Sequence, residues 1–109
     1  MKKELYLVLE NSDTAFATLD ELKKEGFNAT IMSTESLRHA VDYYPEEHHF
    51  FNLRHLEQKE MSQSFLCLFV VEESHLETLK NIIRRYTNSF KDIKGFMYSR
   101  DILDYEGSI

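Results

Sequence analysis

The first third of the chain alternates between strand-like and helix-like spacing. Residues 5–9 form a short apolar run that predicts a strand buried on both faces, or nearly so. From Thr14 onward, apolar residues recur three and four positions apart, which is typical of a helix with one buried face. The polar cluster at residues 11–13 offers N-cap side chains, and Gly26 is placed to end this helix in the left-handed conformation. Residues 27–33 then predict a second strand.

The last third of the chain repeats this order of elements. Residues 65–71 are the most strand-like segment, and residues 76–86 carry apolar side chains at helical spacing. Ser74 and Glu77 have the spacing of a capping box at the start of that helix. Residues 95–98 predict a fourth strand, so the order strand-helix-strand occurs twice.

This repeated order indicates one fold class. Each predicted helix has a single apolar face, so both helices must cover the same face of one sheet. Two right-handed split crossovers predict an α+β fold of the ferredoxin-like βαββαβ type, with a four-stranded antiparallel sheet and two helices on one face. No helix remains for the other face, and the aromatic strand residues predict that this face packs against another subunit.

A long insertion separates the two halves. A hairpin between the second and third strands needs only about two to five residues, whereas the chain has the whole of residues 34–63 there. We therefore expect a single domain over residues 1–109 with an insertion at about residues 35–63. Long insertions in compact domains usually carry function, so the specificity of the protein is expected in this segment.

Composition and charge exclude several classes of protein. Thirteen Lys and Arg against nineteen Asp and Glu give the 109-residue chain a net charge of −6, which disfavours non-specific nucleic-acid binding. No apolar run approaches the ~20 residues of a membrane span, and the charged start does not resemble a signal sequence. The single cysteine, Cys67, cannot form an internal disulfide. We expect a cytoplasmic protein without membrane insertion or a nucleic-acid partner.

Two groups of residues raise the question of metal or thiol chemistry. His48, His49 and His55 lie in the insertion beside several glutamates, and imidazoles with carboxylates are the donors that transition metals prefer. Adjacent histidines of an extended segment point to opposite sides, however, so these three are weak metal candidates and solvated loop histidines are favoured. Cys67 lies in the middle of an apolar strand, which favours a buried structural thiol over a reactive one.

Basic residues gather near the end of the chain. Residues 78–100 contain six Lys and Arg but only one acidic residue. Lys91 and Lys94 fall in the turn that enters the last strand, where a basic turn beside Gly95 is able to hold phosphate oxygens. A solvated basic turn is the alternative. No Walker, dinucleotide-binding or Ser-His-Asp motif is present, so no catalytic residue is predicted.

The motifs of both halves carry a family resemblance. Residues 68–74, 79–87, 95–98 and 101–103 resemble the PII nitrogen-regulatory superfamily in their apolar strand, acidic turn, Ile-Ile-Arg helix, Gly-led strand and short downstream tail. Residues 25–34 resemble the corresponding strand of the PII-like cyclic-di-AMP receptors, and the insertion falls where the family has its T-loop. The chain departs from the family at residues 88–94, which replace a glycine-rich phosphate turn.

The resemblance implies where a ligand binds. PII-like proteins are trimers of ferredoxin-like subunits with ligand clefts between neighbours, at the base of the T-loop. By position, Thr30, Ser33 and Thr34 would lie at this cleft, with Lys91 and Lys94 in the turn that the family calls the B-loop. No resident cofactor and no metal are implied.

The function expected from this resemblance is that of a non-enzymatic signal-transduction protein. It would form a homotrimer, bind a small ligand such as a nucleotide, and act on a regulated protein through residues 35–63. An order–disorder switch of that loop is the expected mechanism.

Three alternatives remain open. A CutA-like protein has the same trimeric architecture and would bind divalent metal ions through His48 and His49. A small enzyme of the dimeric α+β barrel class has the same strand order, with the open sheet face lining a substrate cavity. A plain oligomerising scaffold is the third. A dimer in solution would favour the enzyme, and a trimer would favour the PII-like or the CutA-like protein.

Overall fold

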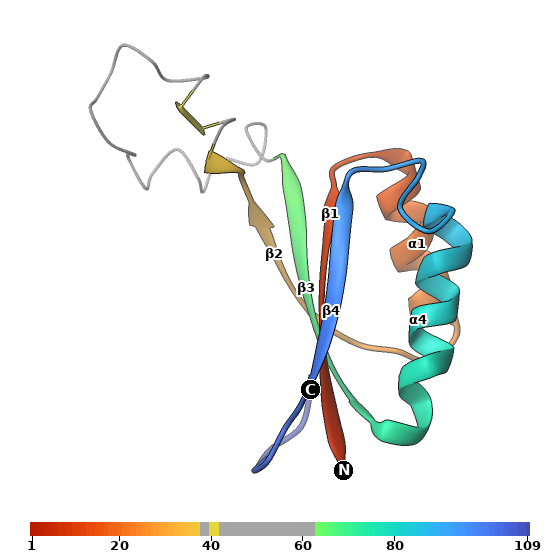
Figure 1. The fold of residues 1–109 in the computed structure, drawn as a ribbon, viewed down its shortest axis with the longest axis vertical. Helices are drawn as coiled ribbons and strands as arrows, with labels where there is room; N and C mark the ends of the chain where they lie inside the picture. Colours follow the sequence, from red (N-terminus) through yellow and green to blue (C-terminus); the bar gives the residue numbers. More distant parts are fainter. Residues whose placement is uncertain (38–39, 42–62) are drawn as a thin grey trace.

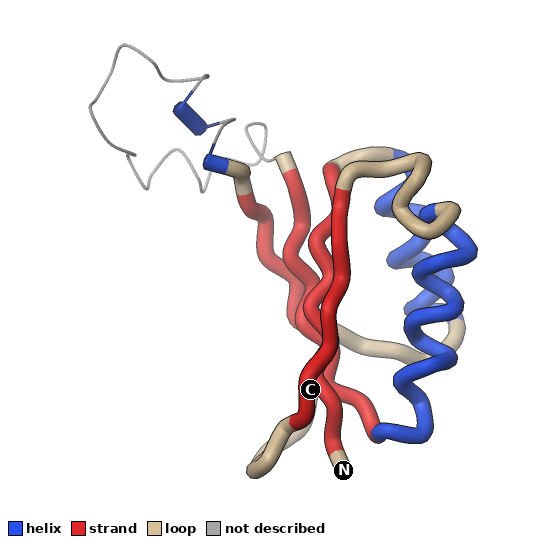
Figure 2. The backbone as a smooth tube through the Cα atoms, viewed as in Figure 1, coloured by secondary structure: helices blue, strands red, loops and turns tan. Residues whose placement is uncertain are grey.

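The computed structural model describes residues 1–37, 40–41 and 63–109, so His48, His49 and His55 lie outside the described residues. Both long helices lie against one face of a single sheet (Figure 1), and Figure 2 shows the same two layers with the helices in blue and the strands in red. The predicted ferredoxin-like α+β fold is confirmed. Within the described ranges, no helix is long and apolar enough to cross a membrane. The elements are β1 (Lys2–Glu10), α1 (Asp13–Lys24), β2 (Thr30–Thr34), β3 (Ser64–Glu72), α4 (Glu73–Thr87) and β4 (Gly95–Asp101).

The sheet has the strand order β2-β3-β1-β4, and every neighbouring pair is antiparallel. β1 and β3 pair along their whole length, from Lys2 opposite Glu72 to Glu10 opposite Ser64. β2 and β4 are therefore the two edges of the sheet. The amino end of β4 and the carboxyl end of β2 lie at the same end of the sheet, on opposite edges.

The hydrophobic core lies between the sheet and the two helices. Leu5, Leu7 and Leu9 of β1 are completely buried there, whereas Tyr6 and Val8 point to the other face and are only half-buried. The prediction that this strand is buried on both faces is wrong, because both helices pack on one side of it. The other buried apolar side chains of the core cluster are Ala15, Leu22, Cys67, Phe69, Leu79, Ile82, Ile83 and Ile93.

The helix ends follow the predictions for α1 but not for α4. The Ser12 hydroxyl accepts a hydrogen bond from the N–H of Ala15 at 3.2 Å, and Gly26 follows α1 with a φ of +90°. The capping box predicted for Ser74 and Glu77 is wrong. α4 begins directly where β3 ends, so Glu72 occupies the N-cap and makes no side-chain cap hydrogen bond.

β2 starts three residues later than the predicted strand at residues 27–33. The N–H of Phe27 donates to the carbonyl of Leu22 at 3.0 Å, which keeps this residue with α1. The Asn28 side chain accepts a hydrogen bond from the backbone N–H of the next residue at 2.9 Å. These local bonds replace ladder bonds, and β2 begins only at Thr30.

β4 begins at a glycine for a steric reason and runs further than predicted. A Cβ atom on Gly95 would lie 2.3 Å from the carbonyl oxygen of Val8, so no larger residue fits without a shift of the backbone. β4 extends to Asp101, beyond the predicted residues 95–98. The N–H of Ile102 then donates to the carbonyl of Lys2 at 3.0 Å, which attaches the C-terminal tail to β1.

Candidate functional site

The three polar residues predicted on the second strand lie on β2 but do not share a face. Thr30 stands opposite Leu68 and Thr34 opposite Ser64, on the sheet face that the helices leave open. Ser33 stands opposite Phe65 and therefore points to the helix side. Because side chains alternate along a strand, Thr30 and Thr34 share one face, about 13 Å apart at a rise of 3.3 Å per residue, and Ser33 lies on the other face.

The two predicted lysines lie at the opposite edge of the sheet. Lys91 and Lys94 are exposed in the turn between α4 and β4, and the carbonyl of Lys94 accepts a hydrogen bond from Glu10 at 2.9 Å. Thr34 lies at the same end of the sheet, but three strand spacings of about 4.8 Å separate the two edges. One chain alone therefore does not join the threonines and the lysines in one site.

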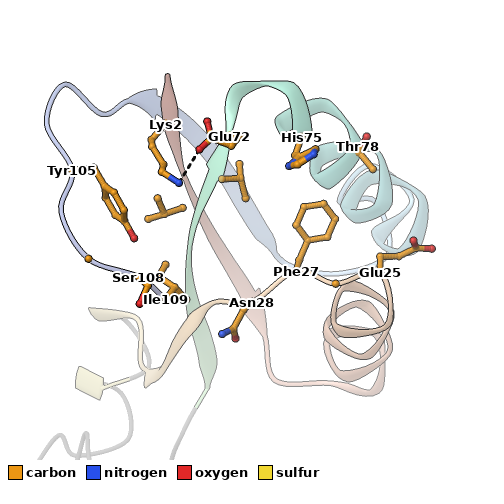
Figure 3. A pocket seen from close by; sticks show the side chains of 14 residues that line it. Lys2, Glu25, Phe27, Asn28, Glu72, His75, Thr78, Tyr105, Ser108 and Ile109 are labelled. Atoms are coloured by element: carbon orange, nitrogen blue, oxygen red, sulfur yellow. Dashed lines mark ion pairs between the residues drawn. The ribbon is translucent and has the colours of Figure 1, made fainter.

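A cleft that the sequence did not predict lies beside the carboxyl half of β3 (Figure 3). Its volume is ≈ 540 Å³, and its walls come from the end of β3, the first turns of α4, the connection between α1 and β2, and the C-terminal tail. The side chains labelled in Figure 3 are Lys2, Glu25, Phe27, Asn28, Glu72, His75, Thr78, Tyr105, Ser108 and Ile109.

The cleft exists because β2 is shorter than β3. Pairing between these strands stops at Thr30 opposite Leu68, whereas β3 continues to Glu72. Residues 69–72 consequently have β1 on one side and no described strand on the other. A strand edge of this kind presents backbone donors and acceptors that are free to bind a ligand.

Val70 turns its backbone into this cleft. Successive residues of a strand direct their N–H and C=O alternately to the strands on either side. The carbonyl of Gln63 accepts a hydrogen bond from the N–H of Asn11, just after β1, at 2.8 Å. The N–H of Glu73 donates to the carbonyl of Met1, just before β1, at 3.0 Å. Odd-numbered residues of β3 therefore bond to β1, and the N–H and C=O of Val70 point the other way, into the cleft that this residue lines.

An ion pair closes one end of the cleft. Lys2 Nζ lies 2.8 Å from Glu72 Oε1, and this hydrogen bond raises the pKa of Lys2 and lowers the pKa of Glu72. Lys2 Nζ also lies 5.1 Å from the centre of the Tyr105 ring, so the same cation holds the C-terminal tail over the cleft. His75 and Thr78 add polar groups from α4 (Figure 3). The arrangement offers a backbone donor and acceptor, the Tyr105 ring and the charged side chains of Lys2, Glu25 and Glu72, which suits a small polar ligand with a planar ring.

The sequence missed this cleft because of the error at the start of β2. In the observed register, a strand that began at residue 27 would place Asn28 opposite Val70 and would close the edge. Asn28 itself was the available signal in the sequence, because asparagine favours turns, where its side chain bonds to nearby backbone N–H groups as it does here.

The open face of the sheet is apolar and aromatic. Met32, Phe96 and Tyr98 are 55%, 53% and 51% exposed on it, and the Tyr6 and Tyr98 rings lie 5.0 Å apart. The ion pair of Arg100 with Glu4 lies at the margin of this face. Half-buried Val8, Leu66, Leu68 and Val70 complete the apolar surface between the two edges.

The described residues hold no metal site. Among residues 1–37, 40–41 and 63–109, no three His, Cys, Asp or Glu side chains are grouped closely enough to bind an ion. The metal candidates His48, His49 and His55 lie outside these ranges.

Comparison with known proteins shows what this chain is similar to. No family model and no curated protein match the sequence. A solved structure of a functionally unknown protein from Pediococcus pentosaceus matches with a TM-score of 0.63 and 12% identity, over 98% of this chain and 97% of the other. The fold is therefore shared along nearly the whole chain.

Structures of CPII, a nitrogen regulatory PII-like protein from Thiomonas intermedia K12, match in the same way. CPII bound to ADP, AMP and bicarbonate has a TM-score of 0.60 and 17% identity, over 98% of this chain and 96% of CPII. CPII bound to ADP, AMP and acetate has a TM-score of 0.57 and 20% identity, over 93% and 85%. The resemblance to PII-like proteins is confirmed at the level of the fold.

The buried thiol gives a first prediction. Cys67 is 0% exposed, and burial raises its pKa from 9.0 to about 11, so the nucleophilic thiolate is scarce. At pH 8 we expect a disulfide reagent to react about one hundredfold more slowly with the folded chain than with the urea-unfolded chain, from the pKa difference alone. Equal rates in the two states would show that Cys67 is accessible and activated.

Proposed function

We propose that this chain is a PII-like regulatory protein that binds a small ligand, a nucleotide, in clefts between chains. The observation that carries the proposal is the match of 98% of the chain to CPII, whose structures hold ADP and AMP. The protein acts as a binding protein and not as an enzyme, and it contacts a regulated protein through residues 35–63.

The open sheet face supports an assembly of several copies. A lone chain leaves Met32, Phe96 and Tyr98 about half exposed, and burying apolar surface stabilises an interface by roughly 25 cal/mol per Å². An identical chain supplies a surface of the same kind, so copies of this chain are suitable partners. The assembly we propose is a homotrimer.

The cleft beside β3 supports a nucleobase as the part of the ligand that is bound there. An adenine edge carries a donor and an acceptor side by side, which match the C=O and N–H that Val70 directs into the cleft. Tyr105 supplies a ring near this edge, whereas the Phe27 ring lies toward the helices and packs against the core (Figure 3).

A second chain is needed to complete this site. Val70 lies six residues along β3 from Ser64, which is about 20 Å at a rise of 3.3 Å per residue. The lysines lie at the Ser64 end of the sheet, further from Val70 than a nucleoside diphosphate reaches. In the proposed assembly, Lys91 and Lys94 of one chain approach the cleft of its neighbour.

Substitution of Val70 tests the nucleobase site. Val70→Pro removes the N–H that faces the cleft, and an unpaired strand edge tolerates proline. We expect AMP to bind about tenfold more weakly, because one buried hydrogen bond is worth about 1.4 kcal/mol in such a site. Isothermal titration measures the affinity, and thermal unfolding checks that the variant folds.

Val70→Ala is the matched control, because it trims the side chain on the open face and keeps the N–H. Wild-type affinity in this variant, together with the loss in Val70→Pro, supports backbone recognition. Equal affinities of both variants and the wild type would place the nucleotide elsewhere, and the absence of any AMP binding by the wild type would reject the proposed function.

Mixed assemblies test whether two chains share one site. One variant, Val70→Pro, damages the half of the site that binds the base. A second variant, with both Lys91→Gln and Lys94→Gln, damages the half that binds the phosphate. If they are refolded together in equal amounts, about a quarter of the clefts regain both intact halves by random pairing. Recovery of that share of AMP sites supports a cleft between chains, whereas a site within one chain would show no recovery.

A further inference from the structure

The turn between α4 and β4, at residues 88–94, has a backbone conformation that few residues other than glycine adopt. Asn88, Ser89 and Phe90 follow one another with φ values of 52°, 55° and 64°. The left-handed region brings Cβ close to the following carbonyl oxygen, so three such residues in a row persist only where their surroundings hold them. The contacts that hold them decide what this basic turn is able to bind.

Five successive backbone N–H groups of the turn donate to other groups of the same chain. The N–H groups of Asn88 and Ser89 both donate to the carbonyl of Arg84, the second at 2.8 Å. The other three donors continue the series without a gap. The N–H of Phe90 donates to the Thr87 hydroxyl at 3.2 Å. The N–H of Lys91 donates to the Asn88 carbonyl at 3.1 Å, and the N–H of Asp92 donates to the Thr87 carbonyl at 3.4 Å.

Thr87 is the centre of this arrangement. It is completely buried, and its hydroxyl donates to the carbonyl of Ile83 at 2.7 Å while it accepts from Phe90. The Phe90 ring packs against the core, and Ile93 is buried. The turn is thus held from its inner side, and its left-handed residues are compensated by hydrogen bonds and packing.

A backbone cradle for an anion needs successive N–H groups that are free and converge on a point outside the loop. We propose that this turn is instead sealed, so that its backbone does not contact an anionic ligand and an anion bound at the turn is held by the side chains of Lys91 and Lys94. Both lysines are exposed. The statement about the lysines rests on the function proposed above, and the statement about the backbone does not.

Binding by charge alone has a distinct signature. Exposed lysines on flexible stems attract an anion without fixing its geometry, and salt screens this attraction. The contribution of a phosphate group to nucleotide affinity is therefore expected to fall as salt is added and to disappear in the chain with Lys91→Gln and Lys94→Gln. Hydrogen bonds from a preformed backbone cradle would persist in that variant.

Amide NMR on the ¹⁵N-labelled full chain tests the sealed turn without a nucleotide. Inorganic pyrophosphate is the probe, and the amide signals of residues 89–92 are followed to millimolar concentration. We expect no saturable downfield shift of several of these signals, because their protons are engaged within the chain, and a small shift confined to Lys91 agrees with binding by its side chain. A saturable downfield shift of several of them would show that the turn opens around an anion and would overturn the proposal.

Substitution of Thr87 tests the centre of the turn. Thr87→Val keeps the shape of the side chain and removes the hydroxyl, so amide exchange at Phe90 is expected to accelerate about tenfold. Thr87→Ser keeps the hydroxyl and is expected to keep the protection. Unchanged exchange in Thr87→Val would contradict the role of the hydroxyl. If that variant does not fold, exchange at Phe90 and Asp92 in the unchanged chain decides, with slow exchange in support and exchange at the free-peptide rate against.

These results separate the two proposals. A saturable amide shift with pyrophosphate would reject the sealed turn and leave nucleotide binding at Val70 standing. Failure of AMP and ADP to bind would reject the proposed function, and unshifted amides would still support the sealed backbone.

Discussion

Two amphipathic helices cover only one face of this sheet, and the proposed function depends on what covers the other face. On the helix side, Leu5, Leu7 and Leu9 are completely buried. On the opposite side, the aromatic rings of Phe96 and Tyr98 stay half exposed. Identical chains that pack through this face would bury those rings. They would also bring the β2 edge of one chain near the basic turn of another, which a single chain holds on opposite edges of its sheet. Assembly and ligand binding are therefore parts of one proposal.

A small local event creates the other half of the proposed site. The left-handed Gly26 and the hydrogen bonds at Phe27 and Asn28 delay the start of β2, and this delay exposes the backbone of Val70. At the far end of the sheet the chain does the opposite, because the turn around Thr87 engages its own donors. The backbone of Val70 is left open by missing strand pairing, whereas the backbone of the turn is engaged in local hydrogen bonds. This contrast favours the proposed recognition of a ligand by its base, with its anionic part attracted by the charge of Lys91 and Lys94.

Much of the fold could be predicted from the sequence, because apolar spacing and the caps at Ser12 and Gly26 are local signals. The site was less predictable, since it depends on where the pairing between β2 and β3 stops. Residues 27–29 lead directly into the strand, and only Asn28 indicates locally that they stay outside the ladder. The cap of α4 depends on where β3 ends, which moved the N-cap from Ser74 to Glu72. The left-handed run that begins at Asn88 contains no glycine, so the sequence showed its charge but not the direction of its N–H groups.

The most direct measurement is the mass of the protein in solution, by light scattering coupled to size exclusion, across a range of concentrations. The proposed assembly predicts a stable species of three times the chain mass of 13.0 kDa. A monomer at all concentrations would contradict it, because the aromatic face would then remain in water and the two halves of the cleft would never meet. A dimer would also contradict it and would direct attention to the open face as the wall of a substrate cavity.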